Sequence, residues 1–394
     1  MRKKALLNPD QPVSTPGELI PFTKVFLTGN EIKYLQDVLE RRHLACNGKY
    51  SQLAHTWLEK RLGARAVFLT GAGTLALEMS ALLLDLEPGD EVLMPSFTFV
   101  TTASAFARAG LVPVFVDIRP DTQNIDETKI ESAITDRTRA IVAVHYAGVG
   151  CDMNKIVAIA RKHNLKVIED AAHGILAKYE DRYLGTIGDL GVLSFHETKN
   201  IVGGEGGALI VNDDKLVDRA RRLWHKGTNK HAMELGLVGK YTWTDLGSAF
   251  ASSEVTASII YAQLEEAEKI VSGRLDAWSR YNSLLRPMAE AGHITLPAVP
   301  GDCEHNGHIF YFLTRDKETR DSLLKHLREN NIEGVFHYIP LHDSPAGQKY
   351  GRPSGDLSRT TNISERLIRL PIWPDLEEEV QKQIVSSIVS FFDC

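Results

Sequence analysis

The residues of this chain that could do chemistry together fall, one after another, just behind short apolar runs. In chain order they are the turn Gly71-Ala72-Gly73-Thr74, then Phe99, Asp170, Ser194 and Lys199. A lysine can form a Schiff base and move a proton, and a carboxylate can keep a pyridine nitrogen protonated. Backbone N–H groups that open a helix can bind a phosphate. Together these groups meet the requirements of a pyridoxal phosphate (PLP) site.

Each residue also has an ordinary structural interpretation. Lys199 precedes the glycine-rich GGEGG and could be a surface lysine beside a flexible loop. Asp170 precedes AAHG and could cap a helix, although a carboxylate at the end of a buried strand needs a partner. Phe99 could be a core residue, Ser194 a satisfied turn hydroxyl, and Gly73 part of a plain strand-to-helix turn. Their joint occurrence in this order favours the PLP site.

Alternating strands and helices must position these groups. Apolar runs predict buried strands at 66–69, 91–94, 113–116, 140–144, 166–169 and 207–211. Helical patterns separate them at 74–84, 99–108, 126–133 and 153–163. This alternation predicts an α/β fold with a mostly parallel sheet and helices on both faces. Ligands of such sheets collect at the carboxyl ends of the strands, where the candidate residues lie.

The pattern also predicts a domain organisation. Residues 1–20 are predicted to be a loose N-terminal extension, and residues 21–252 a large cofactor-binding domain. A long helical pattern begins near Ser253 and leads into a smaller α+β domain that completes residues 253–394. In that domain, strands are expected at 308–314 and 334–339, and helices at 318–330 and 375–391.

Composition limits the class of protein. The chain has 394 residues, of which 43% are hydrophobic and 24% are charged, and its net charge is -6. These values are typical of a globular protein and argue against a nucleic-acid binder. The four cysteines form no CxxC pair, so we expect neither a metal site nor disulfides, but free thiols in a reducing cytoplasm. No run is long and apolar enough to predict a signal peptide or a membrane span.

Several longer segments carry a family resemblance, which runs from about Ile20 to the C-terminus. They include GDEVLMPSFTFV, VIEDAAHG, LGTIGDLGVLSFHETKN, GGEGGA, KYTWTDLGS and FHYIPLHDSPAG. They resemble the DegT/DnrJ/EryC1/StrS sugar aminotransferases, which are PLP enzymes of fold type I. Within that family the segments are most similar to the enzymes that make dTDP-4-amino-4,6-dideoxygalactose. The resemblance implies a homodimer with active sites at the subunit interface.

The resemblance also assigns roles to residues. It implies that Lys199 is the Schiff-base lysine and Asp170 the partner of the pyridine nitrogen. The other implied cofactor contacts are Phe99 on the ring, His173 near the cofactor oxygen, and Gly73, Thr74 and Ser194 at the phosphate. Many relatives have Asn in a KYNLTD-like segment that reaches the phosphate of the neighbouring subunit. Here Thr242 takes that place in KYTWTD, which puts the contact between subunits in doubt.

The implied reaction transfers the amino group of L-glutamate to dTDP-4-keto-6-deoxy-D-glucose, giving dTDP-4-amino-4,6-dideoxy-D-galactose. Candidate substrate contacts are His337, Tyr338 and His342, with Lys226 and Asn229 in the nucleotide site; all five could equally be ordinary strand or loop residues. A gluco-configured product, another nucleotide sugar and a non-catalytic PLP-binding sensor or scaffold are the alternatives. A sugar dehydratase of the same fold would have histidine in place of Lys199.

Overall fold

The central feature of the fold is an eight-stranded sheet in the order β1-β9-β8-β5-β4-β2-β3-β13. The computed structural model describes residues 18–393. The strands are β1 Ala66–Thr70, β2 Glu91–Pro95, β3 Val112–Val116, β4 Thr138–Val144, β5 Lys166–Asp170, β8 Leu190–Ser194, β9 Gly207–Val211 and β13 Arg352–Pro353. Pairing is parallel from β8 through β5, β4, β2 and β3 to β13, whereas β9 runs antiparallel to both β1 and β8.

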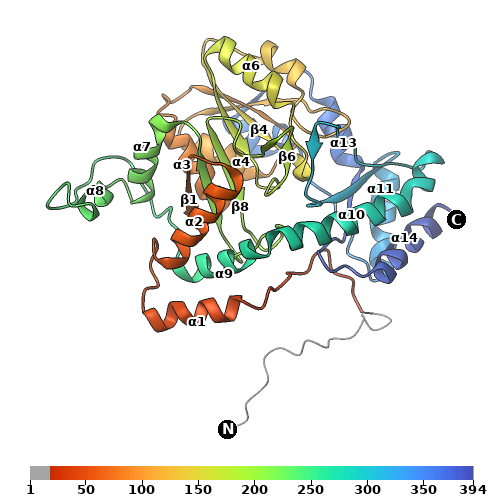
Figure 1. The fold of residues 1–394 in the computed structure, drawn as a ribbon. Helices are drawn as coiled ribbons and strands as arrows, with labels where there is room; N and C mark the ends of the chain where they lie inside the picture. The colour runs from red at the N-terminus through yellow and green to blue at the C-terminus, as the bar shows by residue number, and fades with distance from the viewer. Residues whose placement is uncertain (1–17, 394) are drawn as a thin grey trace, which may run out of the picture.

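Helices cover both faces of this sheet, as the sequence predicted (Figure 1). Within β1, Val67 and Leu69 join one hydrophobic core, whereas Ala66 and Phe68 join the other, because successive strand side chains point to opposite faces. Helices α2 (Lys49–Leu62), α6 (Met153–His163) and α9 (Glu254–Glu265) pack on the first core. Helices α3 (Gly73–Leu83), α4 (Val100–Arg108) and α7 (Asp214–Trp224) pack on the second.

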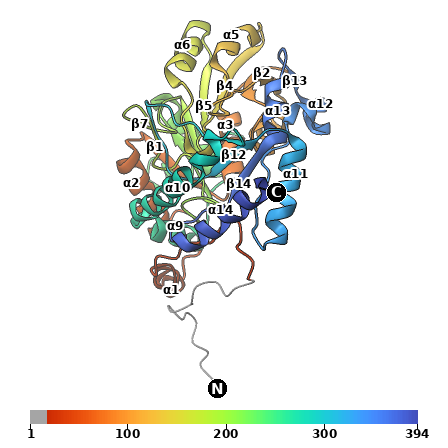
Figure 2. The ribbon, with the colours of Figure 1, turned by 90° about the vertical axis from the view of Figure 1, so that its right-hand side faces the viewer.

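A second, smaller layer is built from the C-terminal part of the chain. Strands β10 (Ile294–Thr295), β12 (Phe310–Thr314) and β14 (Leu367–Leu370) form an antiparallel sheet. It shares a core with α10 (Ala267–Glu290), α11 (Lys317–Glu329) and α14 (Glu378–Phe392). Figure 2 shows β12 and β14 beside α10 and α14. Since β13 comes from this half of the chain yet pairs with β3, the C-terminal half also extends the large sheet.

The remaining elements are short or peripheral. They are the helices α1 (Glu31–Arg41), α5 (Ile130–Ala133), α8 (Lys230–Glu234), α12 (Pro345–Tyr350) and α13 (Ser358–Arg366), the 3-10 turns Glu127–Lys129, Tyr146–Gly148 and Leu341–Asp343, and the strands β6 (Lys178–Tyr179), β7 (Arg182–Tyr183) and β11 (Cys303–Glu304). Within residues 18–393 no helix is both long and apolar enough to cross a membrane. Most of the predicted N-terminal extension, residues 1–17, lies outside the described residues.

Two sequence interpretations are wrong. The expected strand at 334–339 is absent apart from an isolated bridge between Val335 and Arg369. Tyr338 there has φ +33°, a left-handed conformation that interrupts an extended chain. No helix follows Asp170 either, since residues 171–176 form turns. Asp170 is therefore not a helix cap.

Candidate active site

A cradle for an anion lies where α3 begins. Helix α3 starts at Gly73, and its cap residue Ala72 makes no side-chain capping bond. The Leu75 N–H donates to the Ala72 carbonyl at 3.1 Å, but the N–H groups of Gly73 and Thr74 have no hydrogen-bond partner within residues 18–393. Ser194, at the end of β8, lies directly against this turn, because a Cβ placed on Gly73 would come 3.1 Å from the Ser194 Cβ. Thr74 is the second residue of the same helix. Free N–H groups, a positive helix end and a hydroxyl suit a phosphate.

Asp170 is a buried carboxylate at the end of β5. Its Oδ2 accepts a hydrogen bond of 2.7 Å from the Thr102 hydroxyl, and its Oδ1 accepts one of 3.2 Å from the Ala172 N–H. The Thr98 hydroxyl lies 2.8 Å from that of Thr102 and donates to it, since the Thr102 proton is engaged by Asp170. No cation within residues 18–393 lies at ion-pair distance from Asp170. A pyridinium N–H would supply the missing partner.

Phe99 is the N-cap residue of α4 and follows the end of β2 by four residues. The side chain is 54% exposed, which is unusual for a phenylalanine at the end of a buried strand. Its ring centroid is 6.5 Å from that of Tyr338. The exposed aromatic face is therefore available to stack on a planar ligand rather than packed into the core.

Lys199 lies in the turn that leaves β8. Gly204 and Gly206 have φ values of +80° and +152°, so the chain needs glycine there to return into β9. Burial lowers the pKa of the Lys199 amine from 10.5 to about 8, while Asp170 raises that pKa and Arg369 lowers it. A substantial fraction of the amine is therefore uncharged near neutral pH, as a nucleophile or a base must be.

Three buried histidines surround this lysine. The Nδ1 of His173 accepts from the Ala147 N–H at 3.3 Å, which leaves the proton on Nε2, 3.5 Å from the Tyr338 hydroxyl. The ring of His308 packs 4.4 Å from that of His173, and the ring of His337 lies 6.2 Å from it. Burial lowers the pKa of all three well below 6.5, so they are neutral at physiological pH.

The backbone of the lysine turn is tied to these histidines through amides. The Asn200 amide group donates to the Asn306 carbonyl at 2.9 Å, and its oxygen lies 2.8 Å from the Nδ1 of His308. Asn306 in turn donates to the carbonyls of His173 and Ile175, both at 2.8 Å. The turn that carries the lysine and the loop that carries His173 are therefore held in one hydrogen-bonded unit.

A second buried network lies on the other face of β5. Glu169 accepts from the N–H groups of Gly185, Ile187 and Gly188 and from the Nε2 of His145, at 2.6 to 2.9 Å. Burial raises the pKa of Glu169, but these hydrogen bonds outweigh it and bring that pKa below 4.5. The network fixes the strand that ends in Asp170.

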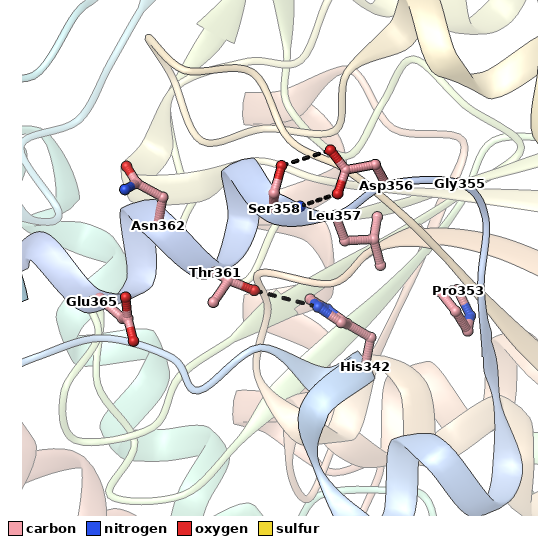
Figure 3. Close-up of a pocket in the computed structure, with 9 residues that line it drawn as sticks. All are labelled: His342, Pro353, Gly355, Asp356, Leu357, Ser358, Thr361, Asn362 and Glu365. Carbon is pink, nitrogen blue, oxygen red and sulfur yellow. Dashed lines mark hydrogen bonds between the residues drawn. The ribbon is translucent and has the colours of Figure 1, made fainter.

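The candidate substrate residues divide into two groups. His337 is buried, with its Nδ1 2.9 Å from the Tyr146 hydroxyl, and Tyr338 packs between Phe97 and Phe99, so both line the cluster around His173. His342 instead bonds to the Ser96 hydroxyl at 2.6 Å. It borders a cavity of about 580 Å³, whose lining residues are seen in Figure 3.

Lys226, Asn229 and Thr242 form a separate loop. The Thr242 N–H donates to the Asn229 side chain at 2.7 Å, and the Asn229 N–H donates to the Thr242 carbonyl at 3.3 Å. The segment between them carries α8, which projects from the body of the molecule in Figure 1. Among the described residues, no hydrogen bond or ring contact joins these three to the cluster around Lys199.

Sequence reasoning missed four residues of this site: Thr102, Asn200, His308 and Arg369. Thr102 had a detectable signal, because it stands in the first turn of the helix that Phe99 opens and so faces the same strand ends. Asn200 adjoins the candidate lysine but carries no distinguishing pattern. His308 lies just before β12 and Arg369 lies in β14, and nothing in their spacing relates them to Lys199.

Comparison with known proteins decides the family. The model of the DegT/DnrJ/EryC1/StrS aminotransferase family matches residues 26–389. The chain belongs to this family. It is 31% identical to the spore coat polysaccharide biosynthesis protein SpsC of Bacillus subtilis, over 95% of this chain and 98% of that protein. It is 32% identical to the GDP-perosamine synthase of Escherichia coli O157:H7, again over 95% and 98%.

Solved structures of aminotransferases have the same fold as this chain. The aminotransferase TlmJ of Streptoalloteichus hindustanus superposes with a TM-score of 0.86 at 27% identity, covering 95% of this chain and 98% of that one. NtdA of Bacillus subtilis, solved with bound cofactor PMP, gives 0.84 at 29% identity, covering 93% and 82%. The cofactor of this protein is PLP. The anion cradle, the exposed ring of Phe99 and the buried Asp170 fit that group.

Proposed function

We propose that this protein transfers the amino group of L-glutamate to C4 of dTDP-4-keto-6-deoxy-D-glucose and yields dTDP-4-amino-4,6-dideoxy-D-galactose. The observation that carries the transamination is the partly buried Lys199, because burial lowers the pKa of its amine to about 8 while the Asp170 carboxylate acts on it. The choice of sugar is supported by the sequence resemblance. Two relatives are named GDP-perosamine synthase, so a GDP-linked keto-sugar is the second candidate substrate.

The residues divide the work as follows. PLP, when bound, supplies an electron sink that weakens the Cα–H bond of an amino acid. Lys199 holds the cofactor. Once the donor's amine has displaced it, its uncharged Nζ takes the Cα proton of the donor and delivers that proton to the cofactor. Asp170, held by Thr102, keeps the positive charge on the pyridine nitrogen. Phe99 stacks on the ring, and Gly73, Thr74 and Ser194 hold the phosphate.

The histidine cluster excludes water from the reacting end. His173 is neutral and presents Nε2–H beside Tyr338, so it can donate a hydrogen bond without adding a charge. We assign His337, whose ring lies 6.2 Å from that of His173, and Tyr338 to contacts with the sugar or the donor. We assign Lys226, Asn229 and His342 to the nucleotide-sugar site as proposals on the sequence alone.

We also propose a homodimer in which the loop with Thr242 reaches the cofactor site of the partner subunit. The loop projects from the body of the protein (Figure 1) and carries exposed apolar side chains. Leu237 is 73% exposed and Trp243 is 75% exposed. Large apolar side chains exposed together on one short segment are typical of a protein–protein contact surface. Light scattering after gel filtration should give the mass of two chains, and Trp243→Glu should shift it toward one.

Incubation with PLP, L-glutamate and each nucleotide keto-sugar tests the function, with the product and its C4 configuration identified by NMR. A 4-amino sugar of galacto configuration from the dTDP substrate supports the proposal. A gluco product, or turnover of the GDP-linked sugar alone, would replace the named substrate. Lys199→Ala should abolish turnover while leaving the circular dichroism spectrum unchanged, and full activity in that variant would refute the mechanism. A cofactor absorbance that never responds to glutamate would instead favour the sensor.

A further inference from the structure

Arg369 stands on the face of the small sheet that is turned toward the cofactor domain. Its strand, β14, alternates sides: Ile368 and Leu370 enter the core of the small domain, whereas Leu367 joins the cluster of Phe97, Tyr146 and Tyr311. Side chains at alternate positions of a strand share a face. Arg369 therefore lies on the same face as Leu367, and it is the register partner of Tyr311 on β12.

The guanidinium of Arg369 has no anionic partner among the described residues. Its Nε and Nη2 both donate to the Phe336 carbonyl, at 3.3 and 3.0 Å, and the Phe22 ring lies 4.7 Å away. Its Nη1 makes no hydrogen bond, and no carboxylate lies at ion-pair distance, within residues 18–393. The Arg369 side chain is partly buried, and burial lowers the pKa of its guanidinium. An anion that binds it would therefore stabilise its charge.

The tyrosine and histidine side chains that pack from Arg369 toward His173 are neutral. The Tyr311 ring packs 5.5 Å from Tyr146, which packs 6.0 Å from His173. Burial raises the pKa of Tyr146 and Tyr311 above their usual value of 10 and lowers that of His173, so none of them is charged near pH 7. Apart from Lys199, which is committed to the cofactor, Arg369 is the cation among the described residues that lowers the pKa of His173 and His337.

We propose that Arg369 is the binding residue for a carboxylate of the amino donor. The inference rests on the proposed function, since it names the group that recognises the amino acid. Arg369 is the register partner of Tyr311, which belongs to the cluster that contains Tyr146 and Tyr338. Its charge also acts on the pKa of Lys199, where the donor's amine must react. One guanidinium with a free Nη1 matches one carboxylate. A nucleotide diphosphate carries more negative charge than this single cation would balance.

The test measures binding of a donor that cannot react. α-Methyl-L-glutamate has no Cα hydrogen, so its equilibrium binding to the PLP-loaded protein can be followed through the cofactor absorbance without turnover. Arg369→Gln should weaken this binding at least about tenfold, the usual loss for a charged hydrogen bond. Arg369→Lys keeps the charge, so its affinity for α-methyl-L-glutamate should lie between those of the wild type and Arg369→Gln. The control is Arg315→Gln, because Arg315 is 83% exposed just beyond β12 and already pairs with Asp316 at 2.8 Å.

The outcomes separate the alternatives. Equal weakening of α-methyl-L-glutamate and α-methyl-L-glutamine assigns Arg369 to the α-carboxylate, and weakening of the former alone assigns it to the side-chain carboxylate. Unchanged binding of α-methyl-L-glutamate in Arg369→Gln would overturn the assignment of Arg369 to the donor carboxylate. A rise in the KM for the keto-sugar by the same factor as the loss of donor binding would overturn it too. If Arg369→Gln fails to fold, Arg369→Lys with unchanged binding would overturn it. A wild-type cofactor that does not respond to L-glutamate would instead refute the proposed donor.

Discussion

The charge state of Lys199 in the cofactor-free protein is the sharpest consequence of the site. With a pKa of about 8, about one quarter of the Lys199 amines would be uncharged at about pH 7.5. With the ordinary value of 10.5, only about one in a thousand would be. Trace acetylation from about pH 6 to about pH 11, read by mass spectrometry of the Lys199 peptide, reports this fraction directly. The exposed Lys325 serves as the internal reference.

Two substitutions should move the midpoint in opposite directions. The carboxylate of Asp170 raises the pKa of Lys199, so Asp170→Asn should bring the midpoint below about 8. The guanidinium of Arg369 lowers that pKa, so Arg369→Gln should bring it above about 8. A wild-type midpoint near 10.5, or shifts of the same sign in both variants, would show that burial and these two charges do not set the reactivity of the amine.

Three further predictions concern the support of the site. Thr102→Val removes the hydroxyl that holds Asp170 and should slow the glutamate half-reaction about tenfold in stopped-flow absorbance, with the fold intact by circular dichroism. Glu169→Gln should cost about 3 kcal/mol of unfolding free energy in urea at neutral pH. The pKa of Glu169 is lowered in the fold, so its stabilisation is present above about 4.5 and is lost as the pH falls through the folded value, a loss the variant should lack. Gly73→Ala should weaken PLP binding at least about tenfold by fluorescence titration, since its Cβ narrows the anion cradle, whereas Gly71→Ala meets only a movable leucine side chain and should not. Equal affinity in the two glycine variants would contradict the cradle.

Much of the fold could be predicted from the sequence, because the strands of a sheet covered on both faces are continuous apolar runs. Such runs located β1, β2, β3, β4, β5 and β9 to within about two residues. They also placed Asp170, Ser194 and Lys199 at strand ends, where a parallel sheet gathers ligands. The failure at 334–339 has the same origin, since GVFHYI is apolar enough to be a strand but contains a left-handed Tyr338 and exposes Phe336 and Ile339.

The roles of single residues depended on what packs against them. From the sequence, Asp170 could equally be a helix cap. In the structure the chain after it forms turns, and its Oδ2 accepts a hydrogen bond from Thr102, 68 residues away in sequence. Nothing in the sequence distinguished Arg369 from the other arginines. Only the pairing of β14 with β12 places it opposite Tyr311, and among the described residues it has no anionic partner. Local periodicity determined from sequence which elements form and which residues end them. The pKa of Lys199 and the lone charge of Arg369 were decided by tertiary structure, because desolvation and charge pairing depend on neighbours that are distant along the chain.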